Sequence, residues 1–352
     1  MLMSDALNEA ANAGTTADCD SPAPGRRRRT SELVNRRSQS AATGPTACSD
    51  VPGEPLAGSA KTATLFLALE NTDSWSHDVL DGGVFGTELS GRIKKWLKGR
   101  DGALQLIRRP GREGRVMDGD PVLYIAHCTP DQPGGAWMEK RTVTDVEELL
   151  SLDIRLGLPT PGATRTTDPL LLVCTHGKRD VCCAVKGRPV AQALHNIHGD
   201  RVWETSHSKG HRFAPTMILL PWNYSYGRIS VAETDRVIRE AADCRLDPAG
   251  CRGRGVWEAK GQVAELAVRE MAGVWGFDDV AAVREPDGEI VHVTLRNGRR
   301  FEVTLVTTVI EGVISSCGDS AGSKKAWIAD AVHEIDRAPK GNSATAGAGP
   351  EC

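Results

Sequence analysis

The chain has 352 residues, which is enough for two modest domains or for one large domain with extended ends. Its 40% hydrophobic and 25% charged residues are typical of a globular protein. A net charge of −3 excludes the strongly basic surface of a general nucleic-acid-binding protein. No apolar run approaches the ~20 residues of a membrane span, and the first twenty residues carry no apolar block. We therefore expect a cytoplasmic protein that binds neither nucleic acid nor membranes.

The first half of the chain begins with a polar segment. Residues 1–60 are dominated by small residues, proline and arginine without periodicity, which predicts a disordered N-terminal tail. We assign residues 61–160 to a small N-terminal α/β region, followed by a Pro-, Gly- and Thr-rich linker over residues 158–168. The predicted elements are a strand over 65–70, a helix ending near 98, strands over 104–108 and 122–127, and a helix over 144–152.

The second half opens on residues 169–174, a continuous apolar run typical of a buried parallel strand. The elements predicted next are a helix over 181–197, strands over 202–206 and 213–221, helices over 232–242 and 262–272, and a hairpin of strands 289–295 and 300–307 around Asn297-Gly298. We assign residues 161–336 to a second domain and residues 337–352 to a flexible C-terminal tail. Alternating strands and helices in both halves predict an α/β or α+β fold.

Three of the ten cysteines lie close together in the sequence, namely Cys174, Cys182 and Cys183. Cys174 ends the predicted buried strand, and Cys183 lies in the first turn of the helix for which Asp180 is the natural N-cap. A cysteine at a helix N-terminus favours the thiolate, because the helix dipole and the free N–H groups attract negative charge. The sequence therefore places reactive or metal-binding sulfur at this turn.

Two histidines follow, His207 and His211, with three residues between them. Two thiolates and two imidazoles form a metal-ligand set, and spacing alone leaves three interpretations open. These are a structural zinc site, a [2Fe–2S] cluster with cysteines on one iron and histidines on the other as in Rieske centres, and no metal at all. His176, in the loop after Cys174, could donate a hydrogen bond to a sulfur or face solvent.

Longer motifs surround these residues. They are Cys174-Thr175-His176-Gly177, Arg179-Asp180, Cys182-Cys183-Ala184, Gly187-Arg188-Pro189, Ser206-His207, Gly210-His211-Arg212-Phe213-Ala214-Pro215, Tyr226-Gly227-Arg228 and Cys251-Arg252-Gly253-Arg254. This pattern resembles the sucrase/ferredoxin-like family of thioredoxin-like [2Fe–2S] proteins, over about residues 62–335. The sequence departs from the family at Lys209, where a glycine is typical, and at Asp73-Ser74-Trp75, where Gly-Pro usually precedes the tryptophan.

The resemblance implies that a [2Fe–2S] cluster is held by Cys174, Cys183, His207 and His211, with Cys182 in the core or as a spare ligand. It implies one-electron transfer or redox sensing with an unidentified redox partner protein, rather than turnover of a substrate. Two other classes remain open. One is a thioredoxin-fold thiol oxidoreductase, although the chain contains no Cys-x-x-Cys, and the other is a zinc-stabilised binding module. The sequence singles out no pair of carboxylates for glycoside hydrolysis.

Overall fold

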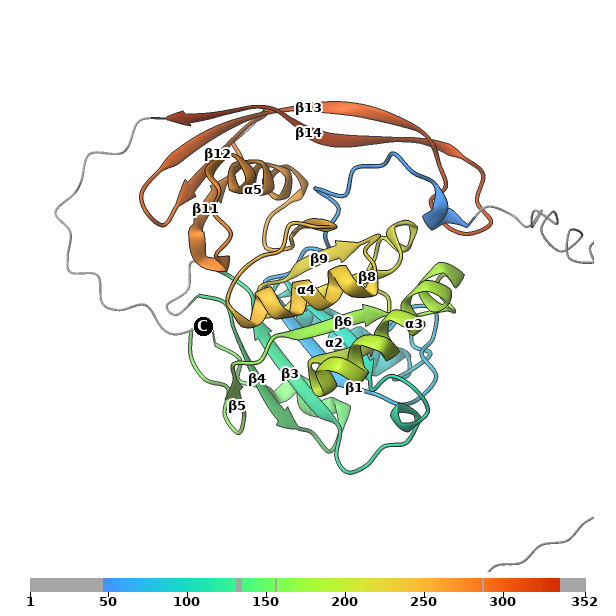
Figure 1. Cartoon of the computed structure of the whole chain (residues 1–352). Helices are drawn as coiled ribbons and strands as arrows, with labels where there is room; N and C mark the ends of the chain where they lie inside the picture. The colour runs from blue at the N-terminus through green and yellow to red at the C-terminus, as the bar shows by residue number, and fades with distance from the viewer. Residues whose placement is uncertain (1–46, 131–134, 156, 287, 336–352) are drawn as a thin grey trace, which may run out of the picture. The chain divides into compact units, whose positions relative to one another are not determined.

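The computed structural model describes residues 47–130, 135–155, 157–286 and 288–335 (Figure 1). The predicted C-terminal tail and residues 1–46 of the predicted N-terminal tail lie outside these ranges. Residues 47–60, in contrast, belong to the folded unit, and both Cys48 and Glu54 are buried there. The folded chain thus begins before the predicted boundary at residue 60. Arg212 and Arg228 hold this polar segment in place through hydrogen bonds. Because these contacts need no apolar side chains, the segment shows no apolar periodicity from which its folding could be predicted.

A ten-stranded mixed sheet, in the order β10-β9-β8-β6-β7-β2-β1-β3-β4-β5, forms the centre of the folded unit. The pairs β1–β2 and β6–β7 are parallel, and the other neighbours are antiparallel. The strands are β1 (Leu65–Glu70), β2 (Gly102–Arg108), β3 (Val122–His127), β4 (Trp137–Thr142), β5 (Thr164–Thr166), β6 (Leu170–Cys174), β7 (Val202–Thr205), β8 (Thr216–Leu220), β9 (Tyr224–Gly227) and β10 (Cys251–Arg254).

The two halves of the chain meet inside this sheet. β2 pairs with β7, so that Ile107 lies opposite Thr205 and Arg108 opposite Glu204. The boundary between β2 and β7 thus separates β1 to β5, from the first half of the chain, from β6 to β10, from the second half. The segment predicted as a linker contains β5 and leads into β6, so the sheet is continuous across it. A division into two domains near residue 160 stays a prediction.

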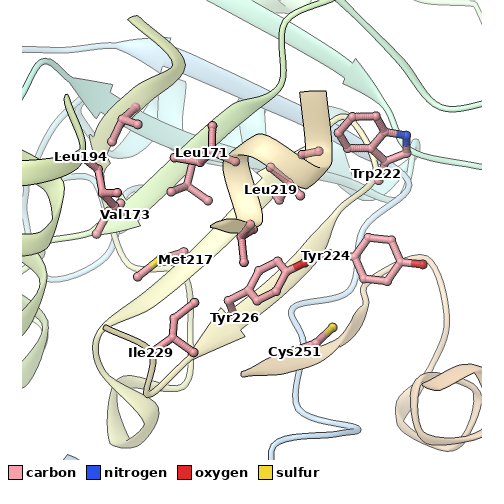
Figure 2. Packing of buried hydrophobic residues seen from close by; sticks show 14 of the residues in the cluster. Leu171, Val173, Leu194, Met217, Leu219, Trp222, Tyr224, Tyr226, Ile229 and Cys251 are labelled. Atoms are coloured by element: carbon pink, nitrogen blue, oxygen red, sulfur yellow. The ribbon is translucent and has the colours of Figure 1, made fainter. Parts of the chain in front are cut away.

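In the described part of the chain, four α-helices accompany the sheets: α2 (Thr87–Lys98), α3 (Val181–His198), α4 (Val231–Ala242) and α5 (Ala259–Ala272). Helices α3 and α4 pack against β6, β8 and β9, where Leu171, Met217 and Tyr226 contribute to one buried apolar cluster (Figure 2). The short 3-10 helices are η1 (Cys48–Asp50), η2 (Glu113–Arg115), η3 (Val146–Ser151), η4 (Gly199–Arg201), η5 (His211–Phe213) and η6 (Phe277–Asp279). This packing fixes the start of α3 beside the end of β6.

A second, antiparallel sheet contains β11 (Val280–Arg284), β12 (Ile290–Leu295), β13 (Arg300–Val313) and β14 (Gly322–Ile335). It covers α5, whose Val263 and Val268 pack against Val291 and Phe301. The predicted hairpin is present, because β12 and β13 pair across Asn297-Gly298 with Gly298 at φ +86°. Figure 1 shows β13 and β14 arching over α5, with their connecting loop next to η1. That loop brings the end of this sheet to the start of α3.

The mixture of helices and strands confirms the α/β class. Several details differ from the sequence expectation. The helix predicted over residues 144–152 is the 3-10 helix η3, and the strand predicted over 213–221 is shortened to β8 because η5 precedes it. Strands β4, β5, β9, β10, β11 and β14 were not predicted. Within the described ranges, none of the helices combines the length and apolar character needed to cross a bilayer.

Candidate metal centre

Cys174 is held at the carboxyl end of β6, where it is fully buried. The chain then turns, and Asp180 caps α3 by accepting a hydrogen bond from the backbone N–H of Cys182 at 2.9 Å. Cys183 follows in the first turn of α3 and is also fully buried. A Cβ atom on Gly187 would lie 2.0 Å from the carbonyl oxygen of Cys174, so glycine at this position allows α3 to approach the end of β6. Strand, turn and helix together place the two sulfurs side by side.

The ligand atoms of Cys174, Cys183 and His207 all lie within 4.8 Å of one another. Cys182, although adjacent in sequence, belongs to a different group. Successive residues of a helix point about 100° apart, so two neighbouring cysteines cannot face the same point. The structure thus brings three of the four predicted ligands together and separates Cys182 from them. The ligand role itself stays a prediction.

The two sulfurs shift each other's pKa in opposite directions. The pKa of Cys174 lies well below its ordinary value, first because Cys183 donates a hydrogen bond to it and also because His207 stabilises the thiolate. The pKa of Cys183 is raised by the same hydrogen bond and by burial. Two cations, the half-buried Lys61 and the buried Arg252, interact electrostatically with Cys174, and desolvation lowers their own pKa values to about 8 and about 9. The site therefore stabilises anionic sulfur.

The loop that carries the two histidines has a left-handed backbone. Lys209 and Gly210 have φ values of +62° and +78°. The buried guanidinium of Arg252 donates to the carbonyl oxygen of Lys209 at 3.2 Å and lies so close to Gly210 that a Cβ atom there would be 2.4 Å from Nη2. Arg252 therefore positions this loop. Sequence reasoning placed Arg252 in a motif but gave it no role, because its hydrogen bonds reach residues far away in the sequence.

His211 lies beside the group of three, with its ring centroid 5.3 Å from that of His207. Its Nε2 donates to the carbonyl oxygen of Ser315 at 2.6 Å and lies 2.9 Å from Ser316 Oγ. This bond assigns the proton to Nε2 and leaves Nδ1 as the free donor atom. Among the described residues, Nδ1 of His211 and Nδ1 of His207 are both buried without a hydrogen-bond partner.

His176 is hydrogen-bonded to the loop that carries His207 and His211. Its Nδ1 accepts a hydrogen bond from the backbone N–H of His207 at 3.1 Å, which fixes the tautomer with the proton on Nε2. The rings of His176 and Trp75 pack in a T-shaped arrangement with 5.6 Å between their centroids. The guanidinium carbon of Arg108 lies 4.0 Å from the centroid of the Trp75 ring. His176 is thus buried and does not face solvent. Trp75 contacts this arrangement although its preceding residues depart from the family pattern.

Fold and site together define an α/β protein with a largely buried group of cysteines and histidines that could hold a metal. The sucrase/ferredoxin-like family model matches residues 56–260, which is more than half of the chain. The protein therefore belongs to the sucrase/ferredoxin-like family. Comparisons with curated proteins and with solved structures found no match.

Proposed function

We propose that the protein binds a [2Fe–2S] cluster through Cys174, Cys183, His207 and His211 and acts in one-electron transfer or redox sensing. The observations that carry this proposal are the buried, unpaired Nδ1 atom of each histidine and the close grouping of His207 with the two thiols. A buried polar atom without a partner costs about 1–3 kcal/mol, and coordination of iron would remove that cost. Two sulfurs and two imidazole nitrogens also match the donor set of a Rieske-type cluster.

A bound cluster supplies one-electron chemistry, and two thiolates with two histidines raise its potential to roughly −150 to +300 mV, from about −400 mV for four thiolates. The chain supplies the surroundings. Cys183 lies in the first turn of α3, where the helix dipole favours negative charge, and the buried cation of Arg252 lies near Cys174, so both favour negative charge at the sulfurs. Burial of both cysteines keeps water away from them.

His211 is oriented by its second nitrogen. The hydrogen bond from Nε2 to the carbonyl of Ser315 fixes the ring and leaves Nδ1 as the free donor atom, and the outer partners of metal-bound histidines commonly act in this way. Because this outer N–H is bound to the protein, His211 is shielded from solvent. Proton exchange at the outer nitrogen of His211 therefore requires the loop around Ser315 to move.

We extend the proposal to the fold name. The elements β6, α3, β7, β8, β9 and α4 give the strand order β7-β6-β8-β9, in which the parallel pair β6–β7 is joined by a helix and the antiparallel strands β8 and β9 follow on the side of β6. This is the arrangement that the term thioredoxin-like describes, and it supports the name for the second half. The proposal also includes a partner protein that donates or accepts the electron, and a reducing compartment such as the cytoplasm, where free thiols persist.

Two alternatives use the same residues. A thiol oxidoreductase needs a sulfur that its substrate can reach, but Cys174 and Cys183 both have 0% of their surface exposed. The burial therefore favours a metal over thiol exchange. A zinc ion at this site is the second alternative, and metal analysis separates it from iron.

The test is anaerobic purification of the full chain, followed by iron, sulfide and zinc analysis and visible spectroscopy. We expect two iron and two sulfide ions per chain and a red-brown colour. Alanine at Cys174, His207 or His211 should each remove most of the iron, because each vacates one coordination position. A matched control is Cys128→Ala, which removes a buried free thiol outside the site and should keep the spectrum. A colourless protein with zinc in place of iron would overturn the proposal.

A further inference from the structure

We propose that Cys48, Cys182, Cys317 and Asp180 form a second metal site, which binds one zinc ion and shares no ligand with the proposed cluster. Their four ligand atoms lie within 4.8 Å of one another. Cys48 and Cys182 are buried, and Cys317 is partly buried. The family resemblance gave Cys182 no defined role and did not involve the other two cysteines.

The distances suit a tetrahedral ion. The sulfur of Cys48 lies 3.6 Å from that of Cys182 and 3.6 Å from that of Cys317, and 3.8 Å from the nearer oxygen of Asp180. Zinc–sulfur bonds of about 2.3 Å at tetrahedral angles place two sulfurs about 3.8 Å apart. The third sulfur pair, Cys182 and Cys317, is at 3.0 Å and would open slightly around the ion.

Asp180 can act as a ligand while it caps the helix. Each of its oxygens accepts one backbone N–H at 2.9 Å, one from Cys182 and one from Cys317. A carboxylate oxygen has two lone pairs, so each oxygen keeps one for a cation. The bonds also orient the carboxylate toward the sulfurs, as the partners of a metal ligand do.

The surroundings favour a cation at this point. The carboxylate of Asp180 brings negative charge within 4.8 Å of all three sulfurs, and its two oxygens lie 3.8 and 3.9 Å from the sulfur of Cys48. A zinc ion bound among them would displace the protons of the crowded thiols and convert them into thiolates.

The site would join three distant segments. The sulfurs come from η1, from α3 and from the loop between β13 and β14, and their positions are 134, 135 and 269 residues apart. That loop also carries Ser315, whose carbonyl holds His211. A zinc ion would therefore fix the segment that orients one predicted cluster ligand, without touching iron itself.

A disulfide is the competing interpretation of these thiols. A bond between Cys182 and Cys317 would require their sulfurs to approach from 3.0 Å to about 2.05 Å, and it would leave the Cys48 thiol and Asp180 unused. Zinc uses all four groups, so the geometry favours the ion. The disulfide is an outcome that the following experiment detects.

The experiment is metal analysis of the full chain purified under reducing conditions. We expect one zinc ion per chain, and Cys48→Ser and Cys317→Ser should each lower zinc content by about ten-fold or more while most of the iron is retained. Cys251→Ala, which removes a buried free thiol elsewhere, is the control and should keep the zinc. If the iron cluster is absent from every sample, the proposed function fails, but the zinc result stands on its own.

A variant that unfolds would lose both metals, so the wild-type protein also needs a direct measurement. X-ray absorption at the zinc edge should show three sulfurs at about 2.3 Å and one oxygen at about 2.0 Å. A shell of two sulfurs and two nitrogens would instead place zinc at Cys174 and overturn the proposal. So would a wild-type chain that takes up no zinc when Zn²⁺ is supplied, zinc retained by both serine variants, or a mass loss of two hydrogens with Cys182 linked to Cys317.

Discussion

The two groups of proposed metal ligands differ in how the sequence supplies them. Cys174, Cys183 and His207 come from one stretch of the chain that lies inside the family match over residues 56–260. The other group takes Cys48 and Cys317 from segments outside that match. A local motif therefore identifies the first group, whereas only the folded chain shows the second.

Helix α3 is where the groups meet. Cys182 and Cys183 are consecutive, and the helical turn of about 100° per residue directs them to different groups. The comparison teaches that a doubled cysteine at a helix start need not be one ligand and a spare. Each of the two can serve its own site.

The largest expected effect is that substitutions at the adjacent Cys182 and Cys183 remove different metals. Cys183→Ala should abolish the visible spectrum and remove most of the iron while zinc stays, and Cys182→Ala should remove zinc while the spectrum stays, because each residue faces only one group. Iron and zinc analysis of both proteins gives the result. Loss of iron from Cys182→Ala with retention in Cys183→Ala would reverse the ligand assignment.

A second prediction concerns a substitution that would displace α3, the helix that carries Cys182 and Cys183. Gly187→Ala should cost about 1–3 kcal/mol of unfolding free energy and weaken retention of both metals, because the new Cβ meets the Cys174 carbonyl oxygen at 2.0 Å. The control is Gly91→Ala in α2, where nothing lies within 4 Å, and it should stabilise the protein by about 0.5–1 kcal/mol. Chemical unfolding measures both, and similar effects at the two positions would refute the close contact.

A third, smaller effect tests what holds residues 47–56. Arg212 donates two hydrogen bonds of 2.6 Å to Glu54, and both side chains are largely buried. Glu54→Gln should therefore cost about 1–2 kcal/mol. The exposed pair Arg92–Glu147 provides the control, since Glu147→Gln should change stability by less than about 0.5 kcal/mol. If the two variants are equally stable in urea, the segment depends on other contacts, such as those of Cys48.

The predictable part of the fold is its apolar part. Strands β1, β3 and β6 are buried along most of their length, and most of their residues are apolar. Their sequences therefore contain the apolar runs from which a strand can be predicted. β10 is equally buried, but it contains Arg252 and Arg254, whose hydrogen bonds replace apolar contacts. Such a strand carries no hydrophobic signal, so pattern analysis could not find it.

The same division applies to the site. Cys174, Cys183 and the histidine loop were recognisable because strand end, helix cap and spacing are local features. Ser315, by contrast, binds His211 through its backbone carbonyl and lies more than a hundred positions away in the sequence. Every residue has such a carbonyl, so the residue type does not reveal this contact. Tertiary packing decides such contacts, and one sequence alone does not contain them in readable form.

The smallest expected effect concerns Lys209, where the family typically has glycine. Its φ of +62° lies in the left-handed region, which costs a residue with a Cβ about 1–2 kcal/mol. Glycine avoids that strain but loses about 0.5–1 kcal/mol of chain entropy on folding, so Lys209→Gly should stabilise the protein by about 1 kcal/mol or less. Lys209→Ala is the matched variant, because it removes the same charge and keeps the strain. The difference between the two unfolding free energies therefore isolates the backbone. If alanine and glycine give equal stability, the bond from Arg252 to the Lys209 carbonyl dictates the loop conformation without measurable strain.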